Sequence, residues 1–271
     1  MKKKSQKMLI YFIVLISALS TIKAQNNNDT LVVQERKQDS ITAATTIQKN
    51  KLNYKSLIVP AAFIGYGVAG LTVRGVKELN RDTKIEIDEH RPTRIKFDDY
   101  TQYAPGIIVY GLNLAGVKGK HNLRDRTIIY ASSQLIAAAF TLPLKYMVKE
   151  ERPDRSNTMS FPSGHAATAF SNAQFMFREY KDTNFLLSLS GYPFAVFTGV
   201  YRMLNDKHWL GDVVAGTGFG ILSTELAYWL YPRIDHLLRG KNKTKNTSLS
   251  STMVMPFYQN NAVGMGFIKT F

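Results

Sequence analysis

One histidine in the chain has a neighbour that suits it to nucleophilic chemistry. His208 stands four residues before Asp212, at the start of the apolar stretch Gly211–Tyr231. Residues four apart share one face of a helix if the helix begins by His208. The carboxylate can then hold one imidazole nitrogen as N–H and leave the other free to attack an electrophile. A satisfied His–Asp pair on a surface has the same spacing, so this pair by itself leaves both interpretations open.

A second histidine opens another apolar stretch, Gly164–Phe177. His165 follows Ser163, which is a natural N-cap residue, and Gly164, which lets the backbone approach a ligand closely. The first N–H groups of a helix and the positive end of its dipole form an anion site. His165 at the rim of that site can donate or accept a proton near neutral pH. A plain helix cap is the alternative for this segment taken alone.

Three cationic side chains accompany the histidines. Lys145 ends the apolar stretch Ile128–Tyr146, and Arg152 follows just before Pro153, which favours extended chain at Arg152. Arg202 stands six residues before His208. A flexible ammonium group and planar guanidinium groups can converge on one anion. In isolation, Lys and Arg at helix ends often serve only to satisfy terminal carbonyls.

Taken together, these segments resemble a known family, the superfamily of type-2 phosphatidic acid phosphatases, bacterial class A acid phosphatases and vanadium haloperoxidases. Its three-part signature appears in order as Lys145-x6-Arg152-Pro153, Pro162-Ser163-Gly164-His165 and Arg202-x5-His208-x3-Asp212. The resemblance covers roughly Leu57 to Trp229. One departure is visible: Tyr201 stands where the third motif usually has serine, which affects a minor hydroxyl contact.

The resemblance implies a role for each motif residue. His208 would attack phosphorus, Asp212 would position it, and His165 would protonate the leaving group and then activate water. The phosphate oxygens would be bound by Lys145, Arg152, Ser163, Gly164 and Arg202. No metal ligand set and no cofactor is expected, because three cations can supply the charge that a metal supplies elsewhere. Vanadate is expected to inhibit, as a mimic of five-coordinate phosphorus.

The elements that must position these residues are predicted to be helices. Six apolar stretches have helical length or spacing: Leu57–Val73, Pro105–Val117, Ile128–Tyr146, Gly164–Phe177, Phe185–Met203 and Gly211–Tyr231. We therefore expect an all-α fold with a six-helix core bundle of the acid phosphatase and vanadium haloperoxidase type. The active site would form where the loops before the fourth and sixth helices meet the end of the third. The charged connector Arg74–Asp99 is predicted as the longest internal loop, with room for a short helix.

The two ends of the chain have different compositions from the helical domain, which is placed at residues 53–240. Residues 1–24 combine a lysine-rich start, the apolar run Met8–Leu19 and a small-residue end, which is the layout of a secretory signal peptide. An uncleaved anchor helix is the alternative, but the run is short for a bilayer. Residues 25–52 are predicted to be a flexible tail. Residues 241–271 contain a polar linker and two short apolar segments, Met253–Phe257 and Ala262–Phe267, which predict a short C-terminal β-hairpin. Export to the periplasm or the cell-envelope membrane follows from the signal.

The charge balance narrows the class of partner. The formal net charge is +15, and removal of residues 1–24, with five lysines and no acidic residue, lowers it to +10. The basic residues are spread along the chain without a nucleic-acid-binding module, so anionic lipid or phosphate is favoured over nucleic acid. Two of the six helices are shorter than the roughly 20 residues needed to span a bilayer. A domain in or on the membrane surface is therefore favoured, with a polytopic enzyme as the alternative; the oligomeric state is left open.

Several other features are interpreted as structural. The glycines Gly216, Gly218 and Gly220 predict close helix packing. His121 is expected to be a surface residue, and Arg126 is assigned to a basic solvated turn. Asp98, Asp99 and Tyr100 either cap a helix or line the pocket.

The predicted activity is hydrolysis of a phosphomonoester or a diphosphate through a phosphohistidine intermediate, without a metal. Phosphorylated lipids or other amphiphilic substrates are favoured by the apolar helices and basic loops, and a soluble small-molecule phosphomonoester is also open. Two alternatives use the same scaffold. One is a vanadate-dependent haloperoxidase, and the other is a non-catalytic envelope protein that binds phosphate or lipid.

Overall fold

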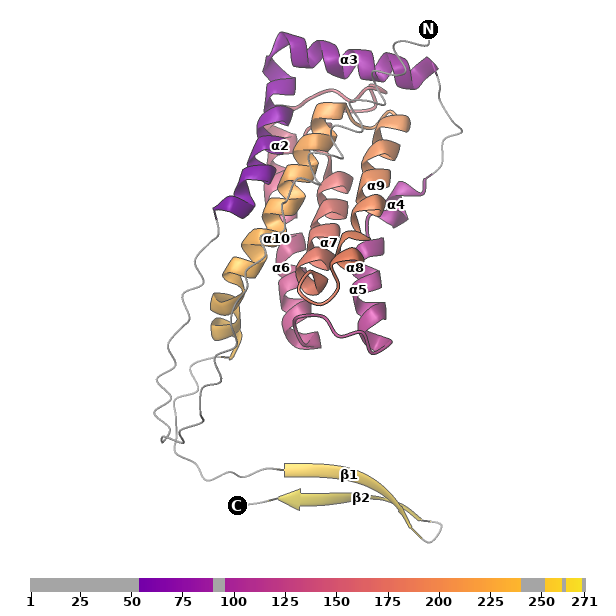
Figure 1. Ribbon diagram of the computed structural model, residues 1–271, viewed down its shortest axis with the longest axis vertical. Helices are drawn as coiled ribbons and strands as arrows, with labels where there is room; N and C mark the ends of the chain where they lie inside the picture. Colours follow the sequence, from indigo (N-terminus) through magenta and orange to yellow (C-terminus); the bar gives the residue numbers. More distant parts are fainter. Residues whose placement is uncertain (1–53, 90–95, 240–251, 260–261, 270–271) are drawn as a thin grey trace, which may run out of the picture. The chain divides into compact units, whose positions relative to one another are not determined.

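The computed structural model describes residues 54–89, 96–239, 252–259 and 262–269, and it is dominated by helices (Figure 1). The helices are α2 (Lys55–Thr72), α3 (Arg74–Glu89), α4 (Asp98–Thr101), α5 (Ala104–Leu114), α6 (Leu123–Val148), α7 (Gly164–Tyr180), α8 (Phe185–Leu189), α9 (Tyr192–Leu204) and α10 (Leu210–Arg239). The predicted all-α fold is confirmed for residues 54–89 and 96–239. The predicted signal peptide, the tail and the polar linker 241–251 lie outside the described residues.

Five of the six predicted core helices are single helices, but the stretch Phe185–Met203 is not. It divides into α8 and α9 at Ser190 and Gly191. Pro193 stands in the first turn of α9, where its missing N–H costs nothing but where it ends a helix arriving from before. Gly191 packs closely on α7, since a Cβ there would lie 3.2 Å from Cα of Ala173. The prediction of one continuous helix was therefore wrong at this junction.

The connector Arg74–Asp99 contains more structure than a loop. Most of it forms the 16-residue helix α3, and its last two residues begin the short helix α4. Helix α3 lies across one end of the bundle (Figure 1) and contacts α2, α9 and α10. Because α3 is mostly charged and keeps only Asn80 buried, a search for apolar stretches does not find it.

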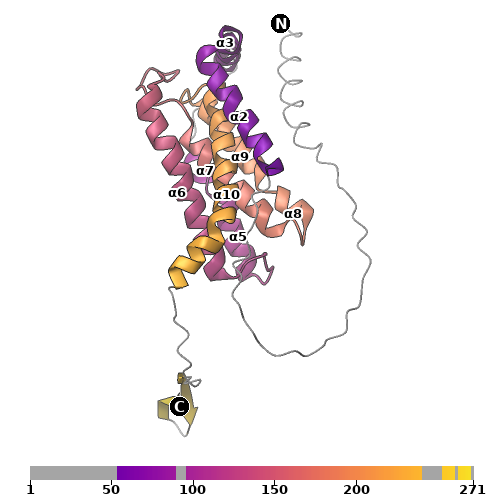
Figure 2. The same cartoon turned by 90° about the vertical axis from the view of Figure 1, so that its left-hand side faces the viewer.

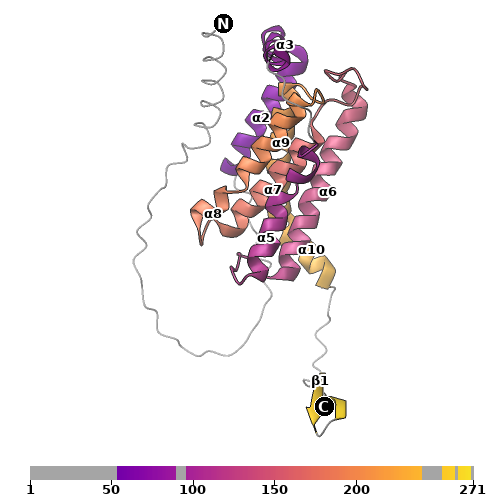
Figure 3. The same ribbon diagram turned by 90° about the vertical axis from the view of Figure 1, so that its right-hand side faces the viewer.

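Helix α10 is the centre of the bundle. It packs against α2 and α6, which lie on either side of it in Figure 2, and also against α7. On the other side α7 packs against α5 and α9 (Figure 3). The close packing predicted for the α10 glycines is confirmed: a Cβ at Gly218 would lie only 2.6 Å from the carbonyl oxygen of Pro60 in α2.

Two residues assigned to the surface are part of a buried polar network instead. Arg126 in the first turn of α6 is fully buried, and its Nε lies 3.1 Å from Oε2 of Glu179. Nδ1 of His121 lies 2.7 Å from the other oxygen of Glu179, which also accepts a hydrogen bond from Tyr228. A buried carboxylate needs such partners. The predictions for Arg126 and His121 were wrong because their acidic partner is more than 50 residues away in the sequence.

Three helices are long and apolar enough to cross a membrane: Lys55–Thr72, Leu123–Val148 and Leu210–Leu238. They differ in what they face. Only 17% and 22% of the apolar windows of α2 and α6 are buried inside the bundle, whereas 78% of the α10 window is. Helices α2 and α6 therefore expose much of their apolar surface, which fits association with a membrane.

The C-terminal residues form the expected hairpin. Strands β1 (Thr252–Gln259) and β2 (Ala262–Lys269) pair antiparallel, with Thr252 opposite Lys269 and Gln259 opposite Ala262.

Candidate active site

The predicted nucleophile and its carboxylate lie together at the start of α10. The helix begins at Leu210, so His208 belongs to the preceding loop rather than to the helix, contrary to the arrangement expected from the four-residue spacing. Nδ1 of His208 still lies 3.6 Å from Oδ2 of Asp212. Both side chains are almost completely buried. Because Nδ1 faces the carboxylate, Nε2 is the nitrogen available for attack.

A serine outside the predicted site residues completes this pair. The hydroxyl of Ser160 donates to Oδ2 of Asp212 and lies 3.4 Å from Nδ1 of His208. The same carboxylate oxygen accepts the backbone N–H of Trp209 at 2.9 Å. These contacts fix the carboxylate of Asp212 against the imidazole. Ser160 lies 52 residues before Asp212, so no local spacing in the sequence signals the contact.

The N-terminus of α7 lies beside the pair. Ser163 is the N-cap, and its Oγ accepts a hydrogen bond from the backbone N–H of Ala166 at 3.4 Å. Its own backbone N–H donates to the carbonyl oxygen of Asp212 at 3.0 Å, which ties the two helix starts together. The first N–H groups of α7, from Gly164 and His165, are those that a helix leaves free to bind an anion.

Lys145, in the last turn of α6, reaches the loop that precedes α7. Its Nζ donates to the carbonyl oxygens of Pro162 at 2.6 Å and Met159 at 2.9 Å. Gly164 is close, since a Cβ there would lie 3.8 Å from Cε of Lys145. The lysine thus holds the loop in place, and an anion at the α7 N-terminus would lie within reach of the same ammonium group.

The two arginines of the site have unused donors. Arg202, at the end of α9, is buried, and its NH1 donates to Oδ2 of Asp98 at 2.7 Å. Within the described residues, Nε of Arg202 and Nε of Arg152 are buried and have no hydrogen-bond partner, as is also the case for NH1 of Arg126 and Nε of Arg178 outside the site. Buried N–H groups without partners are uncommon and call for an explanation. An oxyanion between the two guanidinium groups would satisfy both.

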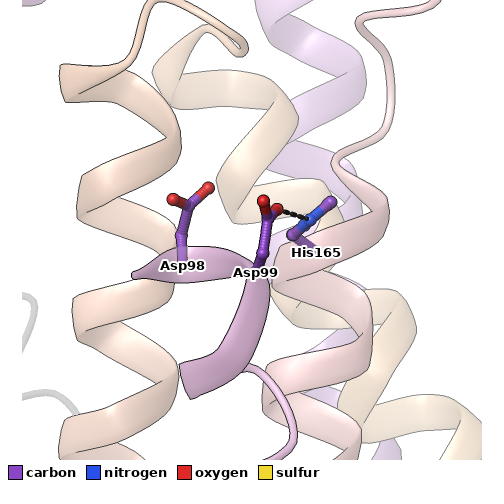
Figure 4. A group of neighbouring side chains, drawn as sticks. All are labelled: Asp98, Asp99 and His165. Carbon is purple, nitrogen blue, oxygen red and sulfur yellow. Dashed lines mark hydrogen bonds and ion pairs between the residues drawn. The ribbon is translucent and has the colours of Figure 1, made fainter. Parts of the chain in front are cut away.

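His165 is paired with an acidic residue from α4. Its Nε2 lies 2.8 Å from Oδ1 of Asp99, and Figure 4 shows this carboxylate turned toward the ring, with Asp98 beside it on the same short helix. The sequence left open whether Asp98 and Asp99 cap a helix or line the pocket, and the structure shows that they contact site residues. Asp99 and His165 are 66 residues apart in the sequence, and Asp98 and Arg202 are 104 residues apart.

Asp98, Asp99 and His165 also form a group whose ligand atoms lie within 4.8 Å of one another, as in a metal site. NH1 of Arg202 lies 2.7 Å from Asp98 and 3.9 Å from Asp99. The guanidinium group already offsets the charge of Asp98 and would repel a bound cation. These donors therefore fit a metal ion poorly.

The electrostatics of the site favour a bound anion and lower the pKa of both histidines. The pKa of His208 is lowered well below its usual value, first by burial and then by the positive neighbours Lys145, Arg202, Arg152 and His165. Burial and the charge of Arg202 also lower the pKa of His165, against the opposing effect of Asp99. The pKa of Arg152 is lowered by burial and by Arg202. A bound anion would offset the repulsion among the positive groups that contributes to each of these shifts.

Helix α3 supports the loop that carries His208. Oδ1 of Asn80 accepts the backbone N–H of Gly211 at 3.1 Å, which satisfies one of the free donors at the start of α10. Nζ of Lys84 lies 2.9 Å from Asp206 in the same loop. A small cavity between α3 and the loop is lined in part by Asn80, Lys84 and His208. Sequence reasoning missed this support because it treated α3 as a connector.

Comparison with known proteins agrees with the motifs. Residues 126–235, which contain all eight predicted site residues, match the sequence model of the PAP2 superfamily. A curated relative, lipid A 1-phosphatase of Porphyromonas gingivalis, is 34% identical over 136 residues, which are 50% of this chain and 31% of that protein. The chain thus spans less than a third of the length of that relative. The resemblance to the superfamily is confirmed for the segment that carries the motifs.

Two solved structures are similar in part. The crystal structure of Aquifex aeolicus LpxE has a TM-score of 0.45 at 17% identity, covering 55% of this chain and 94% of that one. The structure of a transmembrane PAP2-type phosphatidylglycerolphosphate phosphatase from Bacillus subtilis has a TM-score of 0.46 at 17% identity, covering 67% and 98%.

Proposed function

We propose, from the match of residues 126–235 to the PAP2 superfamily, that this protein is a phosphatase of phosphorylated lipids. His208 would form a phosphohistidine intermediate, Asp212 would orient it, and His165 would act as general acid and then as general base. The observation that carries the proposal is the pair of buried guanidinium Nε groups without partners beside a buried His–Asp pair. A tetrahedral oxyanion meets the needs of all these groups at once.

In the first step Nε2 of His208 attacks phosphorus. The P–N bond forms as the P–O bond to the leaving group breaks, and His165 transfers its proton to the departing oxygen. Asp212 stabilises the positive charge that develops on His208, and Ser160 keeps that carboxylate in place. Arg152 and Arg202 stabilise the charge spread over the equatorial phosphate oxygens.

In the second step His165, now neutral, takes a proton from water as the water oxygen attacks the phosphohistidine. The P–N bond breaks, its electron pair returns to Nε2 of His208, and inorganic phosphate leaves. The low pKa of His208 suits this cycle, because the imidazole must be neutral both before attack and after release. The donors at the N-terminus of α7 can hold the phosphate oxygens in both steps.

The substrate class follows from two observations. The curated relative is a lipid A 1-phosphatase, and this chain exposes apolar side chains along α2 and α6, including Ile58, Val68 and Leu135. A domain with such a surface meets substrates that are anchored in a lipid layer. Lipid-linked phosphomonoesters and diphosphates, with lipid A 1-phosphate first among them, are therefore the proposed substrates.

We also propose that the reaction needs no metal and no cofactor. Lys145, Arg152 and Arg202 bring three cationic groups to the site. These groups can stabilise the phosphate oxygens as magnesium commonly does in phosphoryl transfer. Vanadate would bind as the analogue of the five-coordinate transition state, with phosphate competing for the same groups.

The test is phosphate release from detergent-dispersed lipid A, phosphatidic acid and a water-soluble phosphomonoester. The wild-type protein is expected to hydrolyse the lipids with a higher kcat/KM than the soluble ester. His208→Ala should reduce kcat/KM by roughly 1,000-fold or more, as removal of a nucleophile does in other enzymes. His236→Ala is the matched control, because His236 is exposed near the far end of α10. Circular dichroism checks that both variants fold.

Near-wild-type hydrolysis by His208→Ala would exclude the mechanism. Excess chelator should leave the rate unchanged, and a loss that added zinc or magnesium restores would contradict the metal-free proposal. Binding of lipid phosphates without turnover would favour the non-catalytic alternative. Bromide oxidation by the vanadate-loaded protein, in place of phosphate release, would favour the haloperoxidase.

A further inference from the structure

Helix α4 places an acidic pair against two residues of the site. Asp98 accepts from NH1 of Arg202 at 2.7 Å and from the side-chain amide of Asn205 at 3.1 Å. Asp99 lies 2.8 Å from Nε2 of His165. The helix is held on α9 by a hydrogen bond between the hydroxyls of Thr101 and Thr198 at 2.9 Å.

The two carboxylates have different environments. Asp98 is buried, with 1% of its surface exposed, and is satisfied by Arg202 and Asn205. The side chain of Asp99 is 48% exposed and that of His165 is 30% exposed. An exposed ion pair adds little to folding stability. Stabilisation of the fold therefore does not explain the contact between Asp99 and His165, and both side chains are partly exposed to solvent.

The geometry decides which nitrogen of His165 can act on the substrate. A carboxylate accepts a hydrogen bond, so Nε2 carries a proton when it faces Asp99. Nδ1 is then the nitrogen that exchanges its proton with the leaving group and with water. Without a fixed partner the ring could rotate and present either nitrogen, with a loss of productive orientations.

We propose that Asp99 is the positioning residue for His165, which it orients and keeps in the tautomer that the reaction requires. The inference rests on the proposed function and extends it to a residue outside the three motifs. The arrangement parallels the one at His208, where Asp212 faces Nδ1 and leaves Nε2 for phosphorus. Each imidazole of the site then has its own carboxylate, on opposite ring nitrogens.

The two ring nitrogens of His165 account for the protons that move in the two steps. With Nε2–H held by Asp99, the protonated ring gives the proton on Nδ1 to the leaving oxygen as the P–O bond breaks. Nδ1 then accepts a proton from the attacking water as the P–N bond breaks. Asp99 exchanges no proton in either step, and it supports the imidazolium form of His165 before the first step and after the second.

The pH dependence of the first transfer follows from the groups that face His165. Asp99 and Asp98 on α4 favour its protonated form, while Arg202 on α9 and burial oppose it. His208 and His165 also interact. Loss of the Asp99 charge removes a group that favours protonation, so the pKa of His165 should fall further and the alkaline limb of activity should move to lower pH.

The experiment compares Asp99→Asn with the wild type on two substrates, an alkyl phosphate with a poor leaving group and 4-nitrophenyl phosphate with a good one. Only the alkyl phosphate needs its leaving oxygen protonated. The ratio kcat/KM reports on the first step alone, in which the phosphoryl group moves to His208. We expect kcat/KM for the alkyl phosphate to fall at least roughly tenfold, with a smaller change for the nitrophenyl ester. The alkaline limb should shift to lower pH, and Asp99→Glu should restore part of the rate.

The controls separate this inference from the proposed function. Asp182→Asn removes an exposed carboxylate beyond the opposite end of α7 and should change the rate with neither substrate. His208→Ala tests the phosphatase reaction itself, so its failure is distinct from that of Asp99→Asn. Equal losses on both substrates with an unmoved alkaline limb would overturn the positioning role, as would full activity of Asp99→Asn. Zinc inhibition of the wild type that Asp99→Asn relieves would instead assign the acidic pair to a metal site.

Discussion

At the scale of single residues, the proposed mechanism requires two histidines in opposite protonation states. His208 must be neutral to attack, and burial together with four positive neighbours keeps it so at a lower pH than an ordinary histidine. His165 must be protonated to act as the acid, and its pKa is also lowered, with Asp99 opposing the shift. The two requirements define a window on the acidic side of the usual histidine range.

The pH profile of kcat/KM should therefore be bell-shaped with its optimum below about 6.5, the ordinary pKa of histidine. Activity rises with pH as His208 loses its proton and as Asp212, whose pKa burial raises to about 6, becomes ionised, and it falls as His165 loses its own proton. Both limbs lie on the acidic side, because the pKa values of both histidines are lowered and that of Asp212 is raised only to about 6. Initial rates on an alkyl phosphate over a range of buffers at constant ionic strength provide the measurement. A profile that continues to rise above neutral pH would contradict this assignment.

The residues of the three motifs could be chosen from the sequence because each motif is local. Lys145 and Arg152, or His208 and Asp212, stand within one or two helical turns of each other. Ser160 could not be chosen, and Asp98 and Asp99 could be singled out but not given a role, because the partners of all three are 47 to 107 residues away and only the fold brings them together. A serine or an aspartate without a local partner has no sequence signal that distinguishes it from a surface residue.

At the scale of elements, the site lies among the starts and ends of four helices. Helix α3 is not one of them, but it contacts the start of α10. The side chain of Asn80 accepts the backbone N–H of Gly211, although the two residues are 131 positions apart in the sequence. Lys84 reaches Asp206 in the same loop. The His208 loop is therefore fixed by a helix that contributes no residue to the three motifs.

Asn80→Ala should destabilise the fold by ~1–2 kcal/mol, because it leaves a buried N–H at the start of α10 without a partner. A shift of the His208 loop should also lower kcat/KM by roughly tenfold. Thermal unfolding and steady-state kinetics measure the two effects. Glu78→Ala on the same helix is the control, since the contact of Glu78 within the described residues is an exposed ion pair with Arg74. Unchanged stability and activity in Asn80→Ala would show that α3 is only a connector.

Helices were predicted well where apolar residues recur and poorly where they do not. The stretches that became α2, α5, α6, α7 and α10 are apolar stretches with helical length or spacing. The charged helix α3 lacks such a stretch, and the break between α8 and α9 depends on Pro193, whose effect was outweighed by the apolar residues around it. Local chemistry at a single residue decided that boundary.

At the scale of the whole molecule, the helical domain separates three tasks. Helices α2 and α6 present apolar side chains outward, α10 forms the centre, and the ends of α6, α7, α9 and α10 carry the site. The ion pair of Arg126 and Glu179 lies near the other end of α6 from Lys145. A lipid-linked phosphate could thus reach a cationic site while its apolar part stays beside an apolar surface.

The transfer of phosphate to His208 is the central step of the proposed mechanism, and trapping of the intermediate tests it most directly. The protein is mixed with a ³²P-labelled lipid phosphate, quenched in alkaline denaturant, which preserves phosphohistidine, and digested for peptide mapping. We expect label on the peptide that contains His208 in the wild type, and none in His208→Ala. Rapid turnover with no label on the wild-type protein, or label that persists in His208→Ala, would contradict the mechanism.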